Sequence, residues 1–285
     1  MKPAAFRYHA PKTLDEVVAT LAEVAADDGR VLAGGQSLVP IMAFRLARPT
    51  HLVDINGIMA LGRLKTADNN LSIGACVRHA AFYQPVAEGP LGQLLTTVVH
   101  HIGHHPIRTR GTFCGSLAHA DPASEWCLVA ATLDAELVAQ SKRGTRSIAA
   151  KDFFVGIMTT ALEEDELLTE VRLPLLPADT RFGFQEFARR AGDFALSMAL
   201  VTYRLSGKTI AEPRVGIGGA EATTRRIPEA EAALAGKVPG PEAFTAAAEA
   251  AAAAIDPLED HNTNADYRRD LVRTLTRRAL ERAAA

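Results

Sequence analysis

Residues 30–38 read Arg-Val-Leu-Ala-Gly-Gly-Gln-Ser-Leu and join a short apolar run to a longer amphipathic segment. The first part, residues 30–33, predicts a short buried strand. Residues 38–47 predict a helix, with Pro40 in the first turn, where its missing N–H costs nothing. A second strand is predicted at residues 51–55, so this part of the chain reads as a small β-α-β unit.

The elements around this unit alternate between helix and strand. Thr13 and Glu16 form a capping box in front of apolar residues at helical spacing, which predicts a helix at residues 14–24. Further strands are predicted within residues 64–77 and at 136–139, 167–173, 182–187, 197–205 and 214–217, and further helices at 90–102, 243–255 and 267–285. With Pro174 and Pro177 as a boundary, we expect an α+β chain divided into residues 1–58, 59–176 and 177–285.

The composition excludes several classes of protein. The chain has 285 residues, of which 48% are hydrophobic and 22% charged, so it can bury a core. Basic residues number 31 and acidic residues 33, so no net field favours nucleic acid. No apolar run reaches the roughly 20 residues that a membrane-spanning helix needs. We therefore expect a globular protein with no nucleic-acid partner and no transmembrane segment.

The cysteines and the first residues indicate a reducing compartment. Cys76, Cys114 and Cys127 are widely spaced and include no CxxC pair. This pattern is no disulfide framework, and it is too sparse for an iron–sulfur cluster held by this chain alone. The opening residues lack the apolar core of a secretory signal, so we expect a cytoplasmic location.

The glycine pair in residues 33–38 has two interpretations. Glycines between a strand and a helix let a ligand approach the backbone closely, and the amides that follow present an anion site, typically for phosphate. An ordinary tight turn capped by Ser37 explains the same residues equally well. The pattern is neither a Walker A loop nor a GxGxxG fingerprint.

A second stretch, residues 107–125, combines small residues, hydroxyls and two carboxylates with little bulk. Thr112 and Ser116 could donate to phosphate oxygens, and Asp121 and Glu125 could accept from ribose or ribityl hydroxyls. A capped turn before a helix starting near Pro122 would explain Asp121 alone, but not the whole run.

Four histidines precede this stretch at a spacing that can grip zinc. His100, His101, His104 and His105 form two i,i+4 pairs on a predicted helix. The glutamate of an HExxH motif and an obvious third ligand are missing, so we expect packing or partner-facing histidines and no metal site.

Together the two loops resemble the FAD-binding medium subunit of the molybdenum hydroxylases, the family of carbon monoxide dehydrogenase, quinoline oxidoreductase and xanthine dehydrogenase. The resemblance extends over essentially the whole chain. The segments that carry it are residues 6–11, 33–38, 52–55, 107–125, 166–168, 189–195 and 267–269. It implies a two-part FAD-binding region of the vanillyl-alcohol-oxidase type, followed by a C-terminal domain of sheet and helices.

The resemblance also implies a set of residues that bind FAD non-covalently. In that family the first loop wraps the FAD diphosphate and the second loop completes the cradle. Cys114 replaces the family's first glycine in the second loop, and Arg189 or Arg190 would stand in for a lysine that the family often has at the position of Ala188. The implied residues are Ala33, Gly34, Gly35, Gln36, Ser37, Leu38, Thr112, Cys114, Gly115, Ser116, His119, Asp121, Glu125, Leu167 and Arg189.

The function implied by the resemblance is electron transfer. A large partner subunit would hold the molybdenum cofactor, and a small one two [2Fe–2S] clusters, in a dimer of heterotrimers. This chain would pass electrons through FAD to an external acceptor, with no acid–base or nucleophilic catalytic residue of its own. Two alternatives are a stand-alone FAD-dependent oxidoreductase of the same binding fold and a non-enzymatic nucleotide-binding module.

Overall fold

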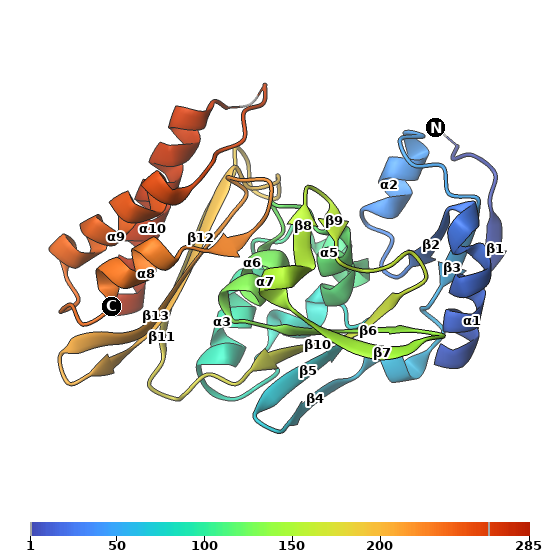
Figure 1. Ribbon diagram of the computed structural model, residues 1–285, viewed down its shortest axis with the longest axis horizontal. Helices are drawn as coiled ribbons and strands as arrows, with labels where there is room; N and C mark the ends of the chain where they lie inside the picture. Colours follow the sequence, from blue (N-terminus) through green and yellow to red (C-terminus); the bar gives the residue numbers. More distant parts are fainter. Residues whose placement is uncertain (1, 262) are drawn as a thin grey trace.

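The computed structural model describes residues 2–261 and 263–285 and confirms the α+β class. Three regions follow one another along the chain: a small N-terminal sheet, a central sheet accompanied by helices, and a C-terminal sheet with helices (Figure 1). The N-terminal unit and the C-terminal helices lie at opposite ends of the molecule in Figure 1, with the central region between them.

The N-terminal unit is the predicted β-α-β arrangement. Its strands β1 (Arg7–His9), β3 (His51–Asp54) and β2 (Gly29–Leu32) are parallel and lie in the order β1-β3-β2. Helix α1 (Leu14–Val24) begins at Thr13, whose side chain accepts from the backbone of Glu16, and buries Val17 and Leu21. The 3₁₀ turn Ala25–Asp27 follows it.

Helix α2 (Leu38–Ala43) is shorter than the predicted helix at residues 38–47. The chain leaves the helix at Arg45, which takes a left-handed backbone conformation with φ of 58°, and the Arg45 N–H donates to the carbonyl of Met42. A left-handed residue cannot continue a right-handed helix. Nothing in the local apolar pattern marks this reversal, so the prediction of the helix end was wrong.

The central sheet is antiparallel, in the order β4-β5-β10-β6-β7. Its strands are β4 (Leu64–Ala67), β5 (Asn70–Gly74), β6 (Glu136–Ser141), β7 (Gly144–Ala149) and β10 (Leu167–Pro174). Helices α3 (Gly89–Val99), α5 (Phe113–His119), α6 (Glu125–Thr132) and α7 (Ala150–Phe153) accompany it, together with the 3₁₀ turns Met59–Gly62 and His79–Tyr83 and the small pair β8 (Phe154–Gly156) and β9 (Thr159–Thr160). Trp126 anchors the core, fully buried, with ring centroids 4.8 Å from Phe113 and 5.1 Å from Phe82.

The C-terminal region is a second antiparallel sheet with helices on both faces. Strands β11 (Arg181–Phe187), β12 (Ser197–Ser206), β13 (Thr209–Gly218) and β14 (Arg225–Arg226) lie in chain order. Helices α8 (Pro228–Leu234), α9 (Pro241–Ala254) and α10 (Ala265–Ala284) cover one face, and α3 and α6 of the central region meet the other (Figure 1). Because α6 packs on β12 and β13, the central and C-terminal regions share an apolar contact.

The histidine segment is broken, contrary to the prediction of one helix carrying two i,i+4 pairs. Helix α3 ends at Val99, and His104 is the N-cap of a new helix, α4 (His105–Arg110). Gly103, with φ of +45°, turns the chain between them. Within residues 2–261 and 263–285, no group of three or more potential metal-binding side chains comes together. The same residues include no helix long and apolar enough to cross a membrane.

Candidate functional site

The first glycine loop connects β2 to α2 with an open backbone. Gly35 adopts φ of +71°, a conformation that glycine takes without strain. Ser37 occupies the N-cap position of α2, but its side chain makes no capping hydrogen bond. In the described part of the chain, the backbone N–H groups of Gly34 to Ser37 have no protein acceptor. The geometry therefore favours the anion-site interpretation over a turn closed by Ser37.

The two glycine loops touch each other. A Cβ built on Gly34 would lie 2.5 Å from the carbonyl oxygen of Arg110 and 2.6 Å from the Cα of Gly111. A groove of about 190 Å³ opens beside this contact. Its lining residues are Leu32, Ala33, Gly34, Gly35, Gln36, Val39, Asp54, Asn56 and Arg110. Of the residues predicted from the sequence, the groove brings together Ala33, Gly34, Gly35 and Gln36.

The second loop is largely helical. Thr112 caps α5, and its Oγ1 accepts from the Gly115 backbone N–H at 3.0 Å. A Cβ at Gly115 would lie 2.5 Å from that oxygen, so the cap requires a glycine here. Cys114 lies inside α5 without positive φ, and its thiol donates to the Ile73 carbonyl at 3.4 Å. The cysteine therefore takes the glycine position without backbone strain, and its thiol points into the core.

The predicted carboxylates lie at the junction with the C-terminal sheet. Asp121 Oδ1 accepts from the Ala123 N–H at 2.9 Å, which makes it a turn residue as well as a candidate ligand. The carbonyl of Pro122, which lies between Asp121 and Ala123, accepts from the Gly219 N–H at 2.7 Å. Glu125 opens α6 half-buried, and burial raises its pKa to about 7. A carboxyl that keeps its proton near neutral pH can also donate to a ligand oxygen.

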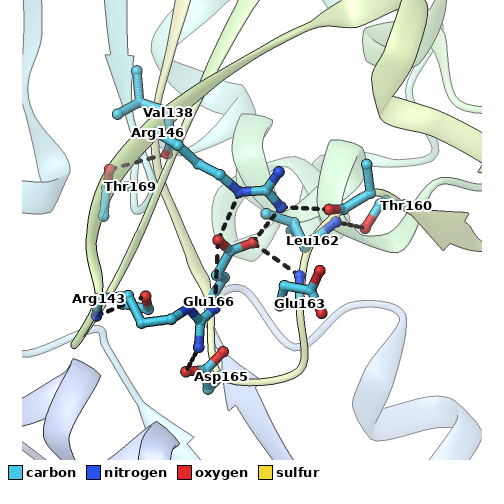
Figure 2. A network of polar contacts seen from close by, with 11 residues as sticks. Val138, Arg143, Arg146, Thr160, Leu162, Glu163, Asp165, Glu166 and Thr169 are labelled. Carbon is cyan, nitrogen blue, oxygen red and sulfur yellow. Dashed lines mark hydrogen bonds and ion pairs between the residues drawn. The ribbon is translucent and has the colours of Figure 1, made fainter.

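Leu167 is the first residue of β10 and is 3% exposed. The turn before it is held by the polar network in Figure 2, where Glu166 accepts two hydrogen bonds of 2.7 Å from the guanidinium of Arg146. Glu166 also accepts from the Glu163 N–H at 2.8 Å, and Arg143 pairs with Asp165. Burial acts to raise the pKa of Glu166, but the bonds from Arg146 and Glu163 outweigh it and lower the pKa. The network fixes where β10 starts, and α5 packs against that strand.

The remaining predicted residues lie outside the groove lining. His119 ends α5 half-buried, and Ser116 lies one turn earlier. Arg189 is exposed in the segment after β11. That segment turns at Asp193, whose N–H donates to the Arg190 carbonyl at 3.1 Å. A Cβ on Gly192 would lie 2.4 Å from the ring of His104, so the segment packs over the break between α3 and α4.

Sequence reasoning missed five groove residues: apolar Leu32 and Val39, and polar Asp54, Asn56 and Arg110. Asp54 ends β3 and Asn56 follows it, at the carboxyl edge of a parallel sheet, where ligands of such folds bind. That position was a usable signal. Arg110 lies in the second loop, and only the folded chain shows that its carbonyl packs against Gly34 and that it lines the groove.

Comparison with known proteins covers nearly the whole chain. Residues 4–176 match the family described as the FAD binding domain in molybdopterin dehydrogenase, and residues 182–283 the CO dehydrogenase flavoprotein C-terminal domain. The nicotine 6-hydroxylase medium subunit of Paenarthrobacter nicotinovorans is 38% identical, with 100% of this chain and 99% of the relative covered.

Solved structures agree with these matches. A carbon monoxide dehydrogenase from Hydrogenophaga pseudoflava contains a chain with a TM-score of 0.95 and 36% identity, covering 100% of this chain and 99% of that chain. A chain of quinoline 2-oxidoreductase from Pseudomonas putida 86 has a TM-score of 0.92 and 37% identity, with the same coverage.

Proposed function

This chain belongs to the FAD-binding medium subunits of the molybdenum hydroxylases, and on that premise we propose that it passes electrons from iron–sulfur clusters of a partner subunit through FAD to an external acceptor. The family match confirms the resemblance found in the sequence, and members of this family are oxidoreductase subunits. When bound, FAD supplies redox chemistry that couples one-electron and two-electron carriers. The chain's own residues would bind and orient the cofactor.

The observation that carries the proposal is the contact of the two glycine loops beside the groove. Glycine at positions 34 and 35 leaves the backbone bare, and the unpaired N–H groups from Gly34 to Ser37 can donate to diphosphate oxygens. Exposed Arg110 adds positive charge at the same edge. The residues present therefore fit the diphosphate bridge of a dinucleotide.

We extend the binding site beyond the groove to the second loop. Thr112, Gly115, Ser116 and His119 follow the contact along α5, and Asp121 and Glu125 continue it toward the C-terminal sheet. Asp121 and Glu125 would accept from ribose or ribityl hydroxyls of FAD, and Leu167 and Arg189 would complete the set of cofactor contacts. Ser37 and Leu38 would contribute backbone N–H groups, and Cys114 only its backbone, because its thiol is buried in the core.

We propose that partner subunits carry the iron–sulfur and molybdenum cofactors of the reaction. Cys76, Cys114 and Cys127 are each buried as free thiols within the core, so the cluster ligands would come from a small iron–sulfur subunit. A large molybdopterin-binding subunit would carry the hydroxylation, and the assembly would be a dimer of heterotrimers in the cytoplasm. The division into residues 1–58, 59–176 and 177–285 belongs to the same proposal.

The experiment is flavin retention by the full chain, purified with the subunits that accompany it. A leucine at Gly35 would place its Cβ 3.2 Å from both Leu32 and Val39 at a positive φ, so Gly35→Leu should lose the flavin absorbance while the chain stays folded. Gly89→Leu is the matched control, because Gly89 has a similar φ of +74° and a Cβ there meets no atom within 4 Å.

The outcomes separate the proposal from its alternatives. Full FAD stoichiometry in Gly35→Leu would contradict the assignment of the groove. A wild-type chain that is colourless and takes up no added FAD would indicate a nucleotide-binding module of another kind. Flavin that stays with the chain after acid precipitation would indicate the covalent attachment common in stand-alone oxidases.

A further inference from the structure

Arg78 lies on a segment whose backbone is paired with the second glycine loop. Phe113 donates its N–H to the Val77 carbonyl at 3.0 Å, and His79 donates to the Gly111 carbonyl at 3.0 Å. Arg78 and Thr112 form an antiparallel bridge between these bonds. The main chain of Arg78 is thereby fixed to the second loop.

The side chain of Arg78 reaches both loops. Its guanidinium donates to the Arg110 carbonyl at 2.5 Å, the oxygen against which Gly34 packs. It also donates to Asn56 Oδ1 at 2.5 Å, and Asn56 Nδ2 donates in turn to the Ala33 carbonyl at 2.8 Å. One half-buried side chain therefore connects the backbone on both sides of the groove.

Two further residues orient the amide of Asn56. Asp54 Oδ1 accepts from Asn56 Nδ2 at 2.6 Å and from the Asn56 backbone N–H at 2.8 Å. Asp54 Oδ2 accepts from the Tyr8 hydroxyl at 2.5 Å. Because Nδ2 is used as a donor here, Oδ1 of Asn56 is left to accept from Arg78. We call Tyr8, Asp54, Asn56 and Arg78 the loop clamp.

We propose that Arg78 is a positioning residue for the cofactor: through the loop clamp it holds the two glycine loops at the separation that a dinucleotide diphosphate requires. The proposal rests on the proposed FAD site. Arg78 acts here through Asn56 and the Arg110 carbonyl, and it is itself absent from the groove lining. Hydrogen bonds from a cation are worth more than neutral ones, which suits a clamp made by one side chain.

The Arg78 segment is also held by contacts that do not involve the clamp. Trp126 Nε1 donates to His79 Nδ1 at 2.9 Å, and burial, with nearby Arg78 and Arg108, lowers the pKa of His79 to about 3, so this imidazole stays neutral. The His79 ring also packs against Gly111, because a Cβ built on Gly111 would lie 2.4 Å from His79 Nε2. These buried contacts hold the Arg78 segment after the guanidinium is removed, so we expect Arg78→Ala to fold.

The experiment measures the dissociation constant of FAD from the full chain, with its copurifying subunits, by quenching of flavin fluorescence. Arg78→Ala should weaken FAD binding by about tenfold or more, because two acceptors lose a charged donor. Sub-denaturing guanidinium chloride should restore part of the affinity, while the same concentration of potassium chloride should not. The matched control is Arg204→Ala, which removes an exposed arginine paired with Asp179 in the C-terminal region.

Two further variants separate positioning from general damage. Arg78→Lys should fall between wild type and Arg78→Ala, because one ammonium cannot reproduce the planar fork across two acceptors. In the double variant Asn56→Ala/Arg78→Ala, the loss of FAD affinity should be smaller than the sum of the two single losses, because both single variants remove the same Arg78–Asn56 bond. Melting of the apo chain reports on folding in parallel.

Several results would overturn the clamp. FAD affinity unchanged in Arg78→Ala, a loss that guanidinium does not rescue, or additive losses in the double variant would each do so. If Arg78→Ala does not fold, wild-type affinity in Arg78→Lys would overturn it equally. A wild-type chain that binds no FAD would instead contradict the proposed function.

Discussion

Gly34 and Arg110 are in direct backbone contact: a methyl group on the Cα of Gly34 would lie 2.5 Å from the Arg110 carbonyl oxygen. The residues are 76 positions apart in the sequence, so the contact joins two separate loops. Backbone atoms cannot move aside as a flexible side chain can. The groove beside this contact therefore depends on the absence of a side chain at position 34.

Gly34→Ala should separate the loops. We expect a loss of about 1–3 kcal/mol in the free energy of unfolding, as overpacking of a well-packed site usually costs. We also expect FAD affinity to fall, because the diphosphate cradle widens. Urea unfolding and flavin titration measure the two effects. Gly62→Ala, which adds a methyl group in open space, is the control. Wild-type FAD affinity in Gly34→Ala would show that the loops do not form the cradle together.

Glu166→Gln should destabilise the start of β10. Glu166 is buried and accepts both bonds from Arg146, whereas Arg146 is partly exposed and can be hydrated when its partner changes. We therefore expect a loss of about 1–3 kcal/mol in urea unfolding at neutral pH. Asp179→Asn, in the exposed pair with Arg204, should cost less than about 1 kcal/mol.

The Glu166–Arg146 pair should make the free energy of unfolding depend on pH. The pKa of Glu166 is lower in the folded than in the unfolded chain, so its stabilisation is present above the unfolded pKa and disappears as the pH falls through the folded one. The difference between wild type and Glu166→Gln should therefore shrink in acid. A difference that stays constant with pH would mean that the charge of Glu166 contributes nothing.

Glu186→Gln should stabilise the chain increasingly as the pH rises. Glu186 lies on β11 with a side chain 6% exposed, and its Oε2 has no hydrogen-bond partner among the described residues. Burial, with a smaller contribution from Glu125, raises its pKa to about 8, and the nearest basic group, His101 Nδ1, is 3.6 Å away. The folded chain therefore keeps a proton that the unfolded chain releases.

This difference in proton binding lowers the free energy of unfolding of wild type progressively as the pH rises from the unfolded pKa to about 8. Relative to wild type, Glu186→Gln should gain about 2–4 kcal/mol in unfolding free energy between pH 5 and pH 8. Exposed Glu164→Gln should gain nothing over the same range. Urea titrations at both pH values test this, and equal pH profiles for wild type and Glu186→Gln would contradict it.

The native chain should not react with a thiol reagent at pH 8. Burial raises the pKa of Cys76 to about 11 and that of Cys127 to about 12, and it raises the pKa of fully enclosed Cys114 as well. Thiols that are buried and protonated are poor nucleophiles. Ellman's reagent should detect none of the three before denaturation and all three after it. Rapid modification of Cys114 in the native chain would mean that its thiol faces the groove.

Much of the local structure could be predicted because its causes lie within short segments. The Thr13 side chain caps α1 as predicted, although Glu16 accepts from the Lys12 N–H and not from that of Thr13, and the apolar run before Gly34 forms β2. The end of α2 at Ala43 could not be predicted, because Arg45 reverses the chain while its side chain bonds to the Lys2 carbonyl, which is far away in sequence. The two histidine pairs were predicted on one helix, but Gly103 turns the chain between α3 and α4.

The sequence by itself determined the family, the α+β class and the two glycine loops, because small residues and turns leave a local pattern that one segment carries alone. The tertiary structure alone decided that Arg78 spans both loops and that the thiol of Cys114 turns toward Ile73. These relationships join residues 22 to 41 positions apart. Side-chain contacts at such separations are set by how the sheets and helices pack, and no local periodicity encodes that packing.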